Sequence, residues 1–134
     1  MMFCKTQMFA LSLGFPDVCK IITPVGPIPI PLPNFAFSTL AIPTIFNHFI
    51  TCMPVHNLLT TTALSNGNEV SIPLGGIVSQ QFMGSKRNLL GSFRTYFQCM
   101  PCTRMLDLSG QNGLLSNIPG LNLSPSQVKV MVLT

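Results

Sequence analysis

The hydrophobic positions of this chain fall in short runs that prolines and glycines interrupt. The clearest example is residues 24–33, where proline comes to occupy every second position and aliphatic residues stand between the prolines. Proline has no backbone N–H and restricts φ, so this segment cannot be a helix or a central strand. The pattern predicts an extended edge segment that turns Ile28, Ile30 and Leu32 toward the body of the protein.

The proline-rich segment has two interpretations. Alternating prolines are one form of ligand for the aromatic grooves that bind Pro-x-x-Pro peptides. The other interpretation is a rigid structural edge. We favour the second, because the aliphatic residues between the prolines would have no role in a solvated recognition tail.

Turn-forming residues are also spread along the rest of the chain. The 134 residues include 12 prolines and 10 glycines, which leaves few windows long enough for an uninterrupted helix. Asn66-Gly67 is a strong turn signal in a polar stretch. Gly75-Gly76 indicates a tight turn, since the Gly-x-x-x-x-Gly-Lys-Ser/Thr spacing of a phosphate loop is absent. We therefore predict a mostly β fold in which no helix exceeds about three turns.

One short segment occurs twice. Residues 50–59 align with residues 97–106 at an offset of 47 residues, and Cys-Met-Pro and a later Leu are identical in both copies. Each copy is an apolar run, a proline turn and a second apolar run, which is typical of a strand–turn–strand unit. We expect the copies to form equivalent units that pack against each other around an approximate symmetry axis.

Composition narrows the classes of function. Only 7% of the residues are charged, against about 25% in an ordinary soluble domain, while 47% are hydrophobic, which excludes a disordered chain. The net charge of +4 reflects a lack of acids, and the basic residues are scattered, so a nucleic-acid surface is not indicated. The length fits one domain. No stretch of about 20 apolar residues is available for a membrane-spanning helix, and we expect no stable membrane insertion.

The amino terminus and the cysteines indicate where the protein folds. Residues 8–13 superficially resemble a signal peptide, but the apolar run is short and residues 12–14 are a poor cleavage site. We therefore expect synthesis in the cytoplasm without a cleaved leader. Five cysteines are an odd number, which disfavours a full disulfide framework and leaves free thiols or a partial metal site.

The second copy of the repeat resembles a family signature. Gly91-Ser92, a strand over residues 93–98 and the run Pro-Cys-Thr-Arg-Met-Leu-Asp over residues 101–107 are similar to the Gly-Ser, strand, Pro-Ala-Ala-Arg, x-x-Asp signature of the PAAR family of bacterial secretion-spike tips. Residues 54–57, Pro-Val-His-Asn, stand at the equivalent point of the first copy in degenerate form. Further segments in the same order resemble the PAAR-like subgroup found beside contractile injection machines: residues 16–20, 24–34, 64–69, 75–79 and 106–108.

The resemblance implies a fold and a function. Members of the family form a small β-rich cone with a pseudo-threefold arrangement of short strands and turns. The base docks on a trimeric VgrG-like spike, and the apex pierces the target membrane. We therefore expect a structural spike tip of a type VI secretion system or a phage-tail-like particle, with one copy per trimer. It would be made in the bacterial cytoplasm, assembled on the spike and delivered outside the cell with it, with a separate effector or adaptor attached.

The expected organisation is a single PAAR-like domain over residues 1–134. An amino-terminal extension over residues 1–14 precedes a core over residues 15–112, and a carboxy-terminal segment over residues 113–134 follows.

The alternative function is a small zinc-binding adaptor module that recruits a separate effector. A catalytic site is not expected, because the chain has only three acids and neither His48 nor His56 lies in a nucleophile signature.

Zinc is the cofactor that the resemblance implies, because PAAR proteins commonly hold such an ion near the apex through His and Cys. The candidate ligands are Cys19, His56, Cys99 and Cys102. Cys19 lies in a region similar to the family's first ligand region, and Cys99-x-x-Cys102 has a spacing compatible with metal. Residues 107–112 depart from the family because they carry no His or Cys. The alternative is that Cys52 and Cys99 are small buried residues in equivalent turns.

Overall fold

The computed structural model describes residues 2–133 of the chain. Two short 3-10 helices, η1 (Ser38–Leu40) and η2 (Glu69–Ser71), lie among its strands. The prediction of a mostly β fold without long helices is confirmed. Within the described residues, no helix has the length and apolar character needed to cross a membrane. The strands are β1 (Met2–Phe3), β2 (Leu11–Thr23), β3 (Gly26–Phe37), β4 (Ala41–Ile42), β5 (Phe49–Ile50), β6 (Met53–Pro54), β7 (Thr61–Thr62), β8 (Lys86–Asn88), β9 (Tyr96–Phe97), β10 (Met100–Pro101), β11 (Leu108–Gln111), β12 (Ile118–Asn122) and β13 (Met131–Val132).

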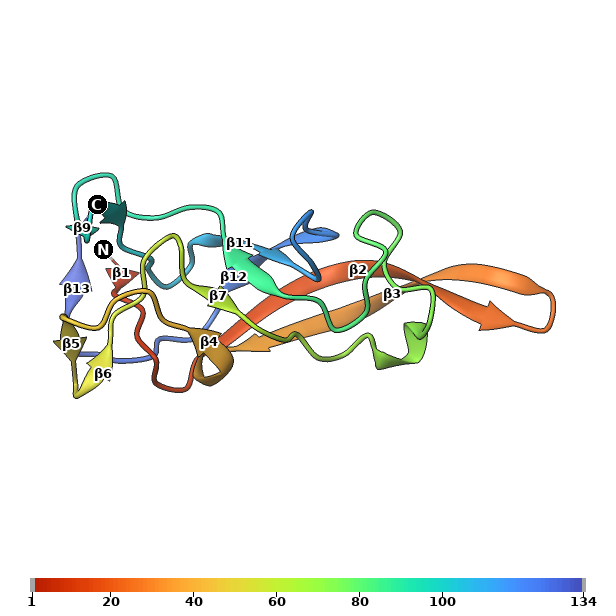
Figure 1. Cartoon of the computed structure of the whole chain (residues 1–134), viewed down its shortest axis with the longest axis horizontal. Helices are drawn as coiled ribbons and strands as arrows, with labels where there is room; N and C mark the ends of the chain where they lie inside the picture. The colour runs from red at the N-terminus through yellow and green to blue at the C-terminus, as the bar shows by residue number, and fades with distance from the viewer. Residues whose placement is uncertain (1, 134) are drawn as a thin grey trace.

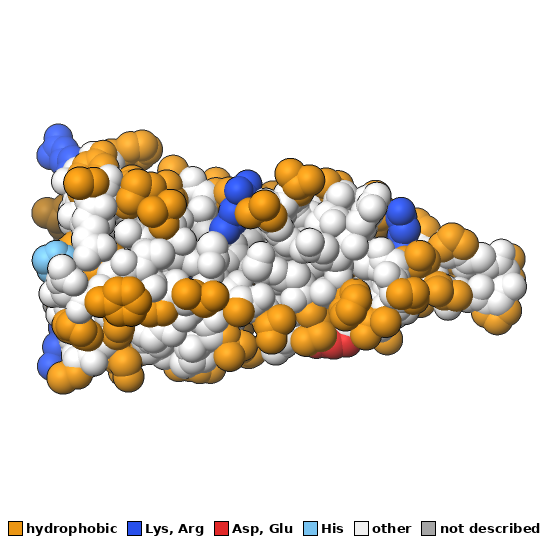
Figure 2. Space-filling view, in the orientation of Figure 1, with side chains coloured by type: hydrophobic (Ala, Val, Ile, Leu, Met, Phe, Trp, Pro, Cys, Tyr) orange, Lys and Arg blue, Asp and Glu red, His pale blue; other side chains and the backbone are white. Residues whose placement is uncertain are grey.

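The strands form one large antiparallel sheet and three small ones. The large sheet has seven strands in the order β3-β2-β12-β11-β8-β7-β4, and the two-stranded sheets pair β1 with β13, β5 with β6 and β9 with β10. Figure 1 shows an elongated molecule with the β2–β3 hairpin at one end and the small sheets and both termini at the other. The outline narrows toward the hairpin (Figure 2), so we name these the hairpin end and the broad end. A pseudo-threefold arrangement of the whole domain stays a prediction.

Strand β3 is an edge of the large sheet, as the alternating prolines predict. Pro29 pairs with Lys20 of β2, and the Lys20 N–H donates to the Gly75 carbonyl oxygen, 2.9 Å away on the far side of β2. The nitrogen of Pro29 therefore faces away from β2, and so do those of the prolines two residues before and after it. Because these positions lack N–H groups, another strand cannot pair fully with this exposed edge.

The expectation that the aliphatic residues of this segment face the body is wrong for two of the three. Ile28 is 45% exposed and Ile30 is 36% exposed. The reason is that β12 pairs with β2 only at Ser12 and Leu13, so the outer part of the β2–β3 hairpin projects beyond the large sheet. At the turn of this hairpin, Val25 is 95% exposed.

The two copies of the repeat form equivalent hairpins, β5–β6 and β9–β10. In each two-residue turn both residues have a positive φ, 52° at Thr51 and 62° at Cys52, and 51° at Gln98 and 63° at Cys99. Two successive positive φ values are the mark of a type I′ turn, whose twist matches a tight hairpin. Cys52 and Cys99 are exposed in these turns, so the interpretation of both as buried residues is wrong.

Polar side chains occupy much of the interior, and one cluster of them surrounds Asp17 on β2. Its Oδ2 accepts hydrogen bonds from the side-chain amides of Asn68 and Asn112, each 3.1 Å away, and its Oδ1 accepts one from Asn117. These residues come from the loop before η2, the end of β11 and the β11–β12 connection. A single buried carboxylate therefore joins β2 to the loop before η2 and to both ends of the β11–β12 connection.

We predict that Asp17→Asn destabilises the fold by about 3 kcal/mol, because three amide donors, two of them on buried residues, lose a charged acceptor and one of them meets a second donor. The free energy of unfolding, measured by chemical denaturation, checks this. Glu69→Gln is the matched control, since Glu69 is an exposed acid and its loss should change stability by about 0.5 kcal/mol or less. Equal effects of the two substitutions would contradict the assignment.

Candidate functional site

Three backbone segments close into a ring at the broad end. They are residues 4–6, 55–57 and 102–104, and we call them the three-segment ring. Isolated β-bridges join the last residue of each segment to the first residue of the next: Thr6 with Val55, Asn57 with Cys102, and Arg104 with Cys4. The central residues of the three segments are also joined to one another by backbone hydrogen bonds: the Lys5 N–H donates to Thr103 O at 2.9 Å, the His56 N–H to Lys5 O at 2.9 Å, and the Thr103 N–H to His56 O at 3.3 Å.

Each segment of the ring directly follows one strand of a small sheet, namely β1, β6 or β10. One backbone bond recurs at all three junctions: Cys4 N–H to Val130 O at 3.1 Å, Val55 N–H to His48 O at 3.1 Å, and Cys102 N–H to Thr95 O at 2.9 Å. We call each ring segment with its small sheet a unit of the ring. Two of the three units come from the sequence repeat. The third is formed by β1 and β13, which lie in the expected extension (residues 1–14) and carboxy-terminal segment (residues 113–134). Both ends of the chain are therefore integral to the ring.

An apolar cluster fills the centre of the ring. Cys4, Val55 and Cys102 hold the first position of the three segments, and each is 0% exposed. Val132 of β13 packs with them, and Ile50 and Phe97 pack against the cluster from outside. Equivalent positions of the three segments thus bury side chains of similar size, as a ring of equivalent segments requires.

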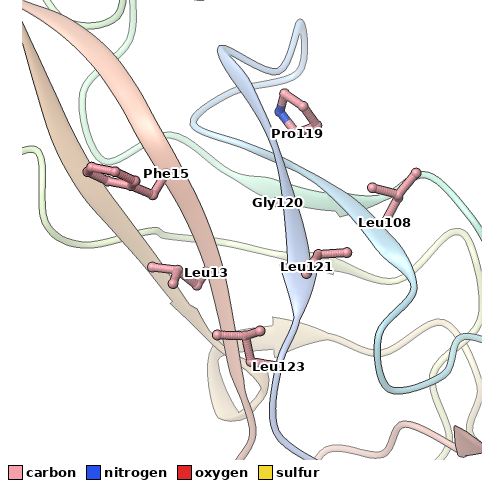
Figure 3. A pocket seen from close by; sticks show the side chains of 7 residues that line it. All are labelled: Leu13, Phe15, Leu108, Pro119, Gly120, Leu121 and Leu123. Atoms are coloured by element: carbon pink, nitrogen blue, oxygen red, sulfur yellow. The ribbon is translucent and has the colours of Figure 1, made fainter.

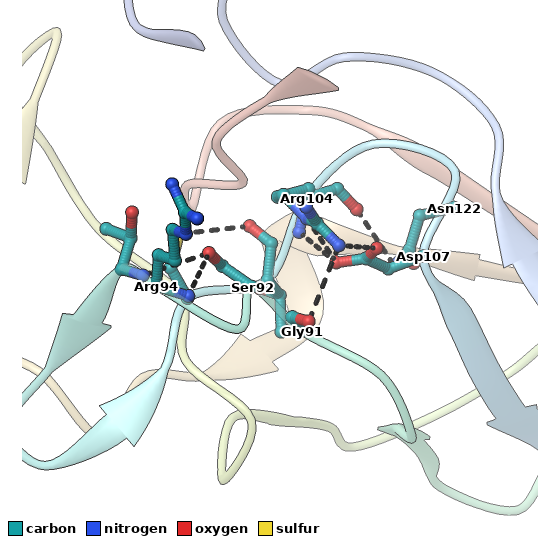
Figure 4. A network of polar contacts seen from close by, with 9 residues as sticks. Gly91, Ser92, Arg94, Arg104, Asp107 and Asn122 are labelled. Atoms are coloured by element: carbon teal, nitrogen blue, oxygen red, sulfur yellow. Dashed lines mark hydrogen bonds and ion pairs between the residues drawn. The ribbon is translucent and has the colours of Figure 1, made fainter. Parts of the chain in front are cut away.

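The signature residues hold one segment of the ring in place (Figure 4). Arg104 and Asp107 form a bidentate pair, with Nε–Oδ2 at 3.2 Å and Nη2–Oδ1 at 3.0 Å, and Nη2 also donates to Gly91 O at 3.4 Å. A Cβ atom on Gly91 would lie 2.9 Å from Cys102 O, so the close approach of the Gly91 and Cys102 backbones requires glycine. Ser92 Oγ accepts backbone N–H groups of the turn that follows it. In this chain the signature is therefore a structural clamp.

The degenerate first copy keeps the geometry of this clamp with smaller groups. In the second copy the Arg104 N–H donates to Asp107 Oδ2 at 2.8 Å. In the first copy the Asn57 N–H donates to Thr60 Oγ1 at 3.2 Å, with the same spacing of three residues. In the third unit the Thr6 N–H donates to Ser126 Oγ at 2.7 Å, so the acceptor comes from a distant part of the chain. All three ring segments are capped in an equivalent way.

Two buried lysines share one acceptor beside the ring. Lys5 Nζ donates to Asn122 Oδ1 at 2.7 Å and to Ser12 Oγ at 2.9 Å, and Lys86 Nζ donates to the same Asn122 oxygen at 3.0 Å. Burial lowers the pKa of Lys5 to about 8, and burial together with the charge of Lys5 lowers the pKa of Lys86 well below its usual value. Asn122 Nδ2 donates to Arg104 O at 3.4 Å, which links the lysines to the clamp (Figure 4).

His56 lies in the ring as a neutral, hydrogen-bonded side chain. Its Nε2 is 2.7 Å from Gln7 Oε1, and Gln7 Nε2 donates to Ala41 O at 2.7 Å, so the imidazole Nε2–H is the donor to Gln7. Burial, and then the charges of Lys5 and Lys86, lower the pKa of His56 to about 3. Protonation of this side chain would place a charge in a closed site that already holds two lysines.

The four expected zinc ligands do not come together. Cys19 lies on β2 beside Asp17, Cys102 contacts Cys4 inside the ring, Cys99 is exposed in the β9–β10 turn, and His56 donates to a glutamine. Among residues 2–133, no group of three or more His, Cys, Asp and Glu side chains is placed to hold a metal ion. The predicted ligand set therefore does not form one site within this chain.

The environment of Cys19 explains why the expected first ligand region does not fit zinc. The amide nitrogens of Asn68 and Asn112 lie 3.8 Å from its Sγ. Their amide oxygens accept backbone N–H groups of the loop before β8, so nitrogens and not oxygens face the thiol. Burial and the Asp17 charge raise the pKa of the Cys19 thiol, whereas a metal ligand is a thiolate. Hydrogen bonds satisfy this cluster without an ion.

Exposed apolar side chains occur along the whole molecule, and two groups of them lie on defined surfaces. At the broad end, Phe49 of β5 is 59% exposed, Tyr96 of β9 54% and Met131 of β13 44%, and these three hold equivalent positions in the small sheets. The second surface is a shallow groove on the large sheet (Figure 3). Its lining has no acid, base or nucleophile, and consists of Leu13, Phe15, Leu108, Pro119, Gly120, Leu121 and Leu123.

Sequence reasoning found the second and first units of the ring through their repeat, but it missed the third. Residues 3–6, Phe-Cys-Lys-Thr, stand where residues 101–104, Pro-Cys-Thr-Arg, stand in the second copy. The shared cysteine was the one signal available. It is too weak to detect, because the partner strand of this unit lies at the opposite end of the chain.

We predict that the protein loses stability as the pH falls from about 6.5 toward about 3, because the unfolded chain binds a proton at His56 that the folded chain excludes. The loss is at most about 1.4 kcal/mol per pH unit from this one group. His56→Gln should make the dependence shallower, and His48→Gln, at an exposed position, should leave it unchanged. Denaturation curves across this range check it, and equal slopes for His56→Gln and the parent would contradict it.

Comparison with family models identifies the family of this chain. The model of the Toxin PAAR-like domain family matches residues 10–120. Comparisons with curated proteins and with solved structures gave no significant match. The match supports a PAAR-type module related to spikes or toxins. With its signature pair Arg104–Asp107 in place and most of its length matched, this chain belongs to the Toxin PAAR-like domain family.

Proposed function

We propose that the broad end caps a trimeric VgrG-like spike, with one copy of the chain on each trimer. The observation that carries this proposal is the three-segment ring, in which three similarly bonded segments each present one small sheet. A trimer offers three equivalent surfaces around one axis, and a single chain can match them when it has three similar faces. Membership of the PAAR-like family supports an association with a spike protein.

The surface chemistry of the broad end favours a lasting contact. Phe49, Tyr96 and Met131 project from equivalent positions of the three small sheets, and each is more than 40% exposed. Aromatic residues and methionine are enriched where proteins bind each other, and charged residues are depleted there. Figure 2 shows few charged side chains on the visible face as a whole, although some of its Lys and Arg side chains lie at the broad end. One apolar anchor per spike subunit is the arrangement that we propose.

The hairpin end then points away from the spike. Its edge lacks N–H groups at the prolines of β3, and Val25 at its turn is 95% exposed, so it is stiff, apolar and unable to pair with other strands. These properties suit the leading point of a particle that enters a membrane. We propose that the protein is made in the bacterial cytoplasm, is assembled there on the spike, and leaves the cell with it, carrying a separate effector or adaptor.

The test is binding to the trimeric spike protein of the same bacterium. We predict that Phe49→Asp and Tyr96→Asp each weaken binding by about 100-fold, because an unpaired charge would be buried in the contact. Val25→Asp is the control at the hairpin end and should bind as the parent does. Light scattering should give one chain per trimer for the parent complex.

The folded state of each variant is checked by its melting temperature before binding is measured. Loss of binding in Val25→Asp together with normal binding in Phe49→Asp and Tyr96→Asp would contradict the proposed orientation. A stoichiometry of three chains per trimer would contradict the match between the ring and the trimer.

A further inference from the structure

Two cysteine thiols meet at the centre of the three-segment ring. The Sγ atoms of Cys4 and Cys102 lie 3.0 Å apart, although the residues are 98 positions apart in the chain. Both side chains are 0% exposed, and both are free thiols in this structure. The bond of a disulfide is about 2.05 Å, so the sulfur atoms need to approach by only about 1 Å.

The backbone around the two thiols is already fixed. Cys4 forms a β-bridge with Arg104, and the next residue of each segment is joined by the Lys5 N–H donating to Thr103 O at 2.9 Å. Each sulfur also lies near a backbone carbonyl, Cys4 Sγ at 3.8 Å from Lys5 O and Cys102 Sγ at 3.4 Å from Thr103 O. The backbone contacts between the two segments therefore keep the two sulfur atoms close to each other.

We propose that Cys4 and Cys102 are a redox site and form a disulfide by exchange with an external disulfide, such as oxidised glutathione or a disulfide oxidoreductase. The Cys4 thiolate attacks one sulfur of the oxidant, forms a mixed disulfide and releases one thiolate. The Cys102 thiolate then attacks Cys4 Sγ and releases the second thiolate. The two protons lost by the cysteines go to the released thiolates, and the oxidant gains two electrons.

The fold suggests why Cys4 reacts first. It directly follows β1, a two-residue strand that pairs with β13 alone, so opening this short strand exposes Cys4. Cys102 follows a tight hairpin inside the chain. Its contact with Cys4 and its burial raise the pKa of the Cys102 thiol in the closed ring, so the closed form is resistant to oxidants. Reaction therefore takes place when the ring is open, either in the unfolded chain or when β1 opens, and in surroundings more oxidising than the cytoplasm.

The disulfide would stabilise the ring at its amino-terminal segment. It ties the amino-terminal segment covalently to the second copy of the repeat, and it closes a loop of nearly 100 residues, for which a large restriction of the unfolded chain is expected. The other cysteines have no such partner: Cys19 contacts amides, and Cys52 and Cys99 are exposed in different hairpins. This property is independent of docking on a spike.

The test uses the full chain with Cys52→Ser and Cys99→Ser, which removes the two exposed thiols and leaves Cys4, Cys19 and Cys102. The protein is refolded in a glutathione redox buffer or in dithiothreitol, denatured, and treated with a maleimide. Intact mass should show one adduct after oxidation and three after reduction, and peptide mapping should show the Cys4–Cys102 link. The oxidised form should melt on the order of 10 °C higher.

Cys4→Val in the same background is the second variant, because valine already fills the equivalent position at Val55. It should fold and show the same melting temperature in both buffers. Three adducts after oxidative refolding, stable glutathione adducts, or a link to Cys19 would overturn the proposal. A melting shift in Cys4→Val equal to that of its parent would do the same.

Discussion

The closure of three backbone segments across Lys5, His56 and Thr103 is the constraint on which the rest of this structure depends. Each central residue gives its N–H to one neighbour and its carbonyl oxygen to the other, so the ring has no free edge among these groups. This closure places the three small sheets at the broad end. It also requires both ends of the chain, because β1 and β13 together make the third unit.

The polar interior follows from the narrow shape. Short strands that cross a thin molecule bury little apolar volume, so much of the interior is held by hydrogen bonds of buried asparagine, serine, threonine and lysine side chains. Asp17 accepts hydrogen bonds from segments that are distant in the sequence, and Asp107 accepts several from Arg104. The chain has few acids, but the hydrogen bonds of these two carboxylates stabilise places where little apolar packing is available. Apolar side chains remain on the outside, where a partner can cover them.

The sequence supported a good part of this fold. Prolines at alternate positions predict an edge strand because they remove the N–H groups that an inner strand needs, and β3 is that strand. The Cys-Met-Pro repeat predicts equivalent hairpins, and its two turns share positive φ values. The structure does not bring the four candidate zinc ligands together, because spacing along the chain does not fix distance in space: Cys19 and Cys102 lie in separate clusters. The third ring unit has too little sequence similarity to be detected.

We propose that the ring at the broad end matches a threefold partner. The most direct measurement is an electron cryo-microscopy reconstruction of the chain on its trimeric spike, calculated without imposed symmetry. We predict that the β1–β13, β5–β6 and β9–β10 sheets each lie on one spike subunit, with Met131, Phe49 and Tyr96 at the three contacts. A spike seated on the groove between Leu13 and Leu121, or on the β2–β3 hairpin, would contradict it.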